Sequence, residues 1–197
     1  MAGKFVFAMA VAGAMAALSA APSAFANEVV LAFGPNPISQ CADLAGRAEA
    51  GEGATTRSLV VCDDAVARAK DARDELAASY VNRGVIHLAR LEYAAALSDS
   101  DAALRLKASL PQALVNRGVA LSAQGHNKDA IAAFTQALAL ASSHPERIYF
   151  NRALALEDVG DAKGAYLDYR KAAQLDPTWD MPKQQLARFT VAHAPTS

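Results

Sequence analysis

The stretch Tyr80-Val81-Asn82-Arg83-Gly84 decides the fold, because it returns twice in the chain. The second copy is Leu114-Val115-Asn116-Arg117-Gly118 and the third is Tyr149-Phe150-Asn151-Arg152-Ala153, at intervals of 34 and 35 residues. Each copy is followed at matching distances by two alanines and a leucine: Ala96, Ala103 and Leu106, then Ala130, Ala137 and Leu140, then Ala165, Ala172 and Leu175. A pattern that recurs at this period predicts a row of similar structural units, each packing on the next.

Small residues in each copy indicate that the units are pairs of closely packed helices. Gly84 and Gly118 have no Cβ, and the alanines lie seven residues apart on one helix face, so neighbouring axes can approach to about 8–10 Å. Larger apolar residues fill the remaining space, and we expect these to form the core: Tyr80, Ile86, Leu104, Leu106, Leu114, Leu121, Ile131, Phe134, Leu138, Tyr149, Leu156, Tyr166, Tyr169 and Leu175.

These residues resemble the tetratricopeptide repeat, a helix–turn–helix unit of about 34 residues. The resemblance covers Ala77 to Trp179 and implies an all-α protein, an α-solenoid whose three repeats occupy residues 77–110, 111–144 and 145–178. The first repeat departs from the family, with Leu91 where a turn glycine is common and Ser100 where an aromatic residue is common. One additional residue precedes the third repeat, and we expect it to alter the local stacking angle.

The first 26 residues have the features of a secretory signal peptide. Lys4 gives a positive start, Phe5–Leu18 is apolar, and Ala24-Phe25-Ala26 is a small-x-small cleavage site, so we expect cleavage after Ala26. No cysteine follows that site to carry a lipid anchor, and no integral membrane segment is expected after cleavage. The pattern predicts a periplasmic or secreted bacterial protein.

Residues 27–75 are expected to form an extended lead-in, up to Pro37, and a helix hairpin with helices near 39–50 and 56–74. Cys41 and Cys62 lie one on each helix. In an oxidising compartment such a pair favours a disulfide, whose loop of about 20 residues stabilises the fold by roughly 3 kcal/mol. A redox pair or a metal site is the alternative, but the sequence has neither a Cys-x-x-Cys spacing nor further ligands nearby. We expect the hairpin to close the N-terminal end of the solenoid.

The C-terminal region is expected to close the other end. We expect residues 179–191 to form a single capping helix, with Leu186 and Phe189 facing the third repeat. Residues 192–197 are expected to form a disordered tail.

The composition argues against several classes of function. The 197 residues carry a net charge of −1, which gives no basic surface for nucleic acid. The sequence contains no Gly-x-Ser-x-Gly, His-Glu-x-x-His or phosphate-binding glycine loop, and its histidines are scattered. Asp63-Asp64 and the pair Asp99 and Asp101 are interpreted as acids on a solvated helix face. We therefore expect no enzyme, no cofactor and no metal site; a catalyst with an unfamiliar site is the rival hypothesis.

The resemblance implies that the first helices of the repeats line a concave groove that receives a partner peptide or helix. The matching positions are Val81, Asn82, Val85, Leu88, Gln112, Val115, Asn116, Val119, Ser122, Arg147, Phe150, Asn151, Leu154 and Glu157, to which the last helix adds Met181, Gln185 and Arg188. Some members of the family hold a partner's C-terminal carboxylate with a clamp of Lys, Asn and Arg. Here Val81 and Val85 occupy two clamp positions, so recognition of chaperone tails is not expected.

Two polar ladders accompany the groove. The asparagines Asn82, Asn116 and Asn151 either bind the backbone of a partner or bond within the scaffold, and the sequence does not separate the two. The second ladder consists of Arg83, Arg117 and Arg152, for which we favour a structural role. Their aliphatic stems would pack between helices while each guanidinium group binds a carboxylate or carbonyl. Ligand binding is the alternative.

The sequence therefore predicts a non-catalytic protein–protein interaction module of the cell envelope, whose partner it does not identify. The alternative is a self-associating structural scaffold of an envelope assembly.

Overall fold

The computed structural model describes residues 36–140 and 142–189, so the expected signal peptide, most of the lead-in and the tail lie outside the described residues. Within these ranges all regular structure is helical, which confirms the all-α prediction. The helices are α1 (Pro37–Glu49), α2 (Thr56–Arg68), α3 (Arg73–Ala89), α4 (Tyr93–Leu106), α5 (Pro111–Ala123), α6 (Asn127–Ala139), α7 (Pro145–Asp158), α8 (Ala162–Leu175) and α9 (Asp180–Leu186).

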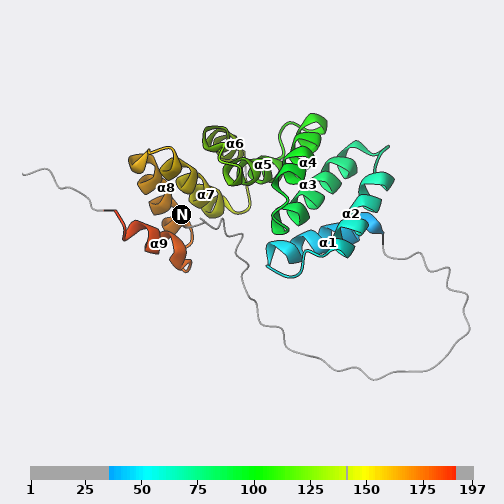
Figure 1. Cartoon of the computed structure of the whole chain (residues 1–197), viewed down its shortest axis with the longest axis horizontal. Coiled ribbons are helices and arrows are strands. Elements are labelled where there is room, and N and C mark those ends of the chain that lie inside the picture. The colour runs from blue at the N-terminus through cyan, green and yellow to red at the C-terminus, as the bar shows by residue number, and fades with distance from the viewer. Residues whose placement is uncertain (1–35, 141, 190–197) are drawn as a thin grey trace, which may run out of the picture.

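The helices form a curved row of pairs, the α-solenoid expected from the repeat pattern (Figure 1). Each of α3 to α8 packs on the helix before it and the helix after it, and α3 also contacts α5. The α1–α2 hairpin packs on α3 at one end of the row, while α9 packs on α8 at the other (Figure 1). None of the helices in the described part of the chain has the length and apolarity needed to cross a membrane.

Local sequence signals set the ends of the helices. Pro111 and Pro145 occupy the first turn of α5 and α7, where a missing N–H has no cost. Gly125 and Gly160 follow the first helices of repeats two and three with φ of 81° and 84°. Leu91 stands at the same point of repeat one and has a φ of 62°, so it takes a left-handed conformation that glycine adopts without a steric penalty.

The core follows the small-residue pattern. The six repeat alanines are fully buried: Ala96, Ala103, Ala130, Ala137, Ala165 and Ala172. Phe134 and Tyr169, the aromatic residues of repeats two and three, are also fully buried. Ser100 replaces them in repeat one, where it is buried and its hydroxyl donates a hydrogen bond of 2.7 Å to the Ala96 carbonyl. Leu175 was wrongly expected in the core. It is 42% exposed at the end of α8, after which the short α9 follows instead of another repeat.

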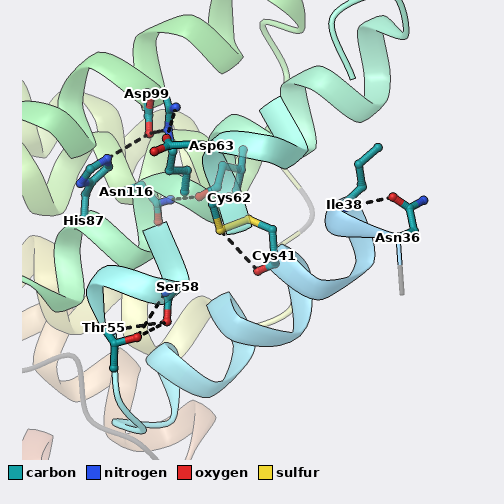
Figure 2. Close-up of a disulfide and its surroundings, with 12 residues drawn as sticks. Asn36, Ile38, Cys41, Thr55, Ser58, Cys62, Asp63, His87, Asp99 and Asn116 are labelled. Carbon is teal, nitrogen blue, oxygen red and sulfur yellow. Dashed lines mark hydrogen bonds and ion pairs between the residues drawn. A yellow bond between two sulfur atoms is a disulfide. The ribbon is translucent and has the colours of Figure 1, made fainter. Parts of the chain in front are cut away.

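The Cys41–Cys62 disulfide joins α1 to α2, as predicted (Figure 2). Both cysteines are fully buried, in a cluster that includes Ala45, Ala65 and Ile86 of α3. The bridge therefore holds the hairpin together at the surface that packs on the first repeat.

Three helices have bounds that differ from the expectation. The first helix begins at Pro37, two residues early, because the Asn36 side chain accepts a hydrogen bond from the Ile38 N–H. The second ends at Arg68 instead of Asp74, and α3 begins at Arg73; the turn between them contains neither glycine nor proline to mark it. The last helix covers Asp180–Leu186 instead of 179–191, although residues 190 and 191 lie outside the described part.

Candidate functional site

A groove of about 680 Å³ runs along the inner side of the solenoid. Helices α3, α5 and α7 all contribute to its lining, together with the end of α1 and the segment that leads into α9. Nine of the fourteen residues expected in the groove line it: Val85, Leu88, Gln112, Val115, Asn116, Val119, Arg147, Phe150 and Asn151. Residues from three successive repeats therefore meet in one continuous depression.

The other five expected groove residues do not line it. Val81 is buried in a core cluster with Ala103 and Ala113, while Asn82 and Leu154 are half-buried away from the lining. The Ser122 hydroxyl contacts the Asn127 carboxamide oxygen at 3.0 Å in the α5–α6 turn. Glu157 accepts a hydrogen bond of 2.6 Å from the Tyr169 hydroxyl and one of 3.0 Å from Arg188.

The three asparagines of the ladder are in different environments. Asn116 is 2% exposed; its amide donates to the Val81 carbonyl at 3.2 Å, and its oxygen accepts from Gln112 at 3.0 Å. It therefore ties α5 to α3 as part of the scaffold. Asn151 lines the groove and Asn82 does not. The helices α5 and α7 contact each other less than α3 and α5 do. The additional residue of the third repeat lies in the segment between α6 and α7.

The arginine ladder has the structural role favoured by the sequence. Arg83 bonds both oxygens of Asp99, at 2.9 and 2.7 Å, and Arg152 bonds both oxygens of Asp168, at 2.7 and 2.9 Å. These hydrogen bonds raise the pKa of both guanidinium groups above the usual value, because they stabilise the charged form. Sixteen residues separate the partners in each pair, so each arginine joins the two helices of its own repeat.

Repeat two has Ala133 where the other repeats have the aspartate. Its arginine, Arg117, instead donates a hydrogen bond of 2.9 Å from Nε to the carboxylate of Asp101 on α4, in the preceding repeat. The interpretation of Asp99 as a solvated acid was therefore wrong. Asp99 is 4% exposed and Asp101 half-buried, and both hold an arginine. Asp63 is exposed, yet it also bonds Arg83, at 2.8 Å, and it lies next to Asp99 in Figure 2.

The sequence pattern missed two walls of the groove. Ala48 and Glu49 reach it from α1, and the Glu49 carboxylate accepts a hydrogen bond of 3.2 Å from Gln112. On the other side the lining includes Asp176, Thr178, Trp179, Asp180 and Gln184. These residues lie outside the repeated positions, so comparing one repeat with the next could not have identified them.

The last helix contributes different residues from those expected. Met181 lines the groove, but Gln185 and Arg188 do not; they bond each other, and Arg188 also bonds Glu157. Trp179, directly before α9, packs on Phe150 with ring centroids 4.8 Å apart. The segment before the helix and the helix residues Asp180, Met181 and Gln184 therefore form this end of the groove together.

The remaining perturbed groups have structural causes. A hydrogen bond with His87 lowers the pKa of Glu92, and hydrogen bonds from Thr178 lower that of Asp176. Burial raises the pKa of the Tyr169 phenol, and its bond to Glu157 adds to this effect. Among residues 36–140 and 142–189 no group of three or more His, Cys, Asp or Glu residues is placed to hold a metal ion.

Comparisons with known proteins agree with this architecture. Two family models of the tetratricopeptide repeat match the chain, one over residues 111–144 and one over residues 146–178. The chain therefore contains tetratricopeptide repeats. Repeats of this class stack into solenoids whose concave surfaces serve for binding. No curated protein has a sequence that matches this chain significantly.

Solved structures share the fold. The structure described as MamA 41-end from Desulfovibrio magneticus RS-1 has a TM-score of 0.62 at 19% identity and covers 79% of this chain and 84% of its own. A MamA RS-1 double mutant has a TM-score of 0.60, also at 19% identity, with 79% and 83% covered. The Sgt2 TPR domain from Aspergillus fumigatus has a TM-score of 0.52 at 26% identity and covers 56% of this chain and 74% of its own.

Proposed function

We propose that this protein is a non-catalytic protein–protein interaction module of the cell envelope, which binds a peptide or helix of a partner in the groove. The observation that carries the proposal is that residues of three successive repeats line one depression, closed at its two ends by α1 and by Trp179. Such a shape matches an elongated partner better than a small molecule, because its lining is spread over α1, α3, α4, α5, α7 and α9 and over the segments that precede α7 and α9.

The lining supports binding through apolar contacts. Val85, Leu88, Val115 and Val119 come from α3 and α5, and Met181 from α9. Val85 is already buried in the free protein, whereas Leu88, Val115, Val119 and Met181 are half-buried. A partner would cover their remaining exposed apolar area, at about 25 cal/mol per Å².

The test is a matched pair of substitutions in a purified complex. Val119→Arg places a long cation inside the groove, whereas Leu167→Arg makes a similar change on α8, where the leucine is 42% exposed and outside the groove. Partners captured from an envelope extract are identified by mass spectrometry, and their affinity is then measured by calorimetry. We expect Val119→Arg to weaken binding at least tenfold and Leu167→Arg to leave it unchanged, with both variants folded by circular dichroism. Equal affinity for both variants would place the binding surface elsewhere.

The envelope location rests on the signal peptide expected over residues 1–26. Its test is the N-terminal sequence of the protein recovered from a bacterial periplasmic fraction, which should start at Asn27. An intact N-terminus in the cytoplasmic fraction would contradict the location without affecting the groove.

A further inference from the structure

The charged residues along the groove are mostly acidic, although the whole chain is nearly neutral. Glu49 reaches the groove from α1, Glu146 from α7, and Asp176 and Asp180 from the segment around the start of α9. Among the described lining residues, Arg147 is the one Lys or Arg. The full chain, by contrast, has 19 Lys and Arg against 20 Asp and Glu. The groove therefore concentrates negative charge.

The internal contacts of these carboxylates leave much of that charge uncompensated. Glu49 accepts a hydrogen bond from the neutral Gln112, and Asp176 accepts from the backbone N–H and hydroxyl of Thr178. Glu146 has an internal partner in His144, whose Nδ1 lies 3.1 Å from the carboxylate. The charge left for a partner is therefore that of Glu49, Asp176 and Asp180. Asp180 contacts Lys183 at 3.2 Å, but its side chain is 75% exposed, where such a pair is weak. A carboxylate has about four acceptor sites, so each can take a further donor.

An aromatic surface lies at the end of the groove that Asp176 and Asp180 line. Trp179 is half-buried, packs on Phe150, and stands between Asp176 and Asp180 in the sequence. The face of an indole attracts a cation, and tryptophan is the best of the aromatic side chains in this respect. The α3 and α5 side of the groove, in contrast, is lined by Val85 and Val119.

We propose that the groove selects a partner segment that carries a Lys or Arg side chain next to apolar residues. The cation lies against Trp179 and the carboxylates of Asp176 and Asp180, while the apolar residues lie against α3 and α5. This inference rests on the proposed function and names the chemistry of the partner. An acidic segment is disfavoured because it would bring like charges together.

The experiment uses the chain purified after export and a phage-displayed library of random 16-residue peptides. Selected peptides are synthesised and titrated while tryptophan fluorescence is recorded, because Trp179 is the only tryptophan in the sequence and reports directly on the groove. We expect enrichment of Lys and Arg beside apolar residues. Replacing the selected cation by Gln should weaken binding about 3- to 30-fold, the range of a partly desolvated cation–π contact.

A matched pair of variants separates local recognition from general charge. Asp180→Asn, in the groove, should weaken binding of the cationic peptide about two- to fivefold, and Asp129→Asn, on α6 outside the lining, should leave it unchanged. Equal losses with both variants would overturn the inference. So would selected peptides that are neutral or acidic, even where they change Trp179 fluorescence and so leave groove binding intact. Selected peptides whose binding is insensitive to Val119→Arg would contradict the groove itself.

Discussion

Gly118 offers a sharp test of the packing, because it is one of two equivalent glycines with different neighbours. A Cβ added at Gly118 would lie 2.6 Å from Cε1 and 2.8 Å from Cδ1 and Cζ of the fully buried Phe134 ring, so the ring or the helix would have to shift. A Cβ added at Gly84 would meet Asn116 Nδ2 at 3.5 Å and nothing closer, which is ordinary van der Waals contact. The reason for the difference is Ser100, which takes the place of the aromatic ring in repeat one.

The two substitutions to alanine should therefore have opposite effects. Alanine in a helix interior is favoured over glycine by about 0.5–1 kcal/mol, so Gly84→Ala should stabilise by that amount. Gly118→Ala receives the same gain but also an overpacking cost of about 1–3 kcal/mol, so it should destabilise by about 1–2 kcal/mol. For a chain of this size, each 1 kcal/mol of change in the free energy of unfolding shifts Tm by about 2–4 °C.

The assay is urea unfolding followed by circular dichroism at 222 nm, with thermal unfolding alongside. Phe134→Leu provides the control, because removing the ring should abolish the penalty of Gly118→Ala in the double variant. If Gly118→Ala were as stable as Gly84→Ala, or if Phe134→Leu left its penalty unchanged, the close helix–ring contact in repeat two would be refuted.

Three further changes test other parts of the account. Leu91→Gly should stabilise the protein by about 0.5–1 kcal/mol in urea unfolding, because glycine relieves the left-handed conformation, whereas Leu88→Gly in regular helix should destabilise it. Reducing the Cys41–Cys62 disulfide should lower the free energy of unfolding by about 3 kcal/mol, and a Cys41→Ala/Cys62→Ala variant should show no response to reductant. The lowered pKa of Asp176 means that its carboxylate stabilises the fold above the unfolded-state pKa of about 3.9 and that this contribution is lost as pH falls through the folded-state value. The stability difference between wild type and Asp176→Ala, measured in urea, should therefore shrink below about pH 4; a difference that grows on acidification would contradict this assignment.

The repeat pattern predicted the solenoid and most of the floor of the groove, because a fixed period places equivalent residues on equivalent faces. It did so even for repeat one, where Leu91 and Ser100 depart from the family. The disulfide could also be predicted, since the two cysteines fall on adjacent helices of a short hairpin.

The sequence could not show which repeated residues leave the common pattern. Asn116 and Asn151 both line the groove, but Asn116 is 2% exposed and bonds the Val81 carbonyl, and Asn82 at the same position of repeat one does not line it. Asp99 looked like a surface acid because its partner, Arg83, lies sixteen residues away on another helix. The walls of the groove at Glu49 and Trp179 come from the ends of the array, where periodicity gives no information.

The most direct test of groove binding is a map of site-specific photo-crosslinks on the full chain in cells. A photoreactive residue is placed at Val119 or Asn151 inside the groove, or at Val60 or Leu167, which are exposed elsewhere. If the groove binds the partner, the same partner is crosslinked from both groove positions and from neither control position. Crosslinks to that partner from Val60 or Leu167 and none from the groove would contradict it, and crosslinks only to a second copy of the chain would favour the self-associating scaffold.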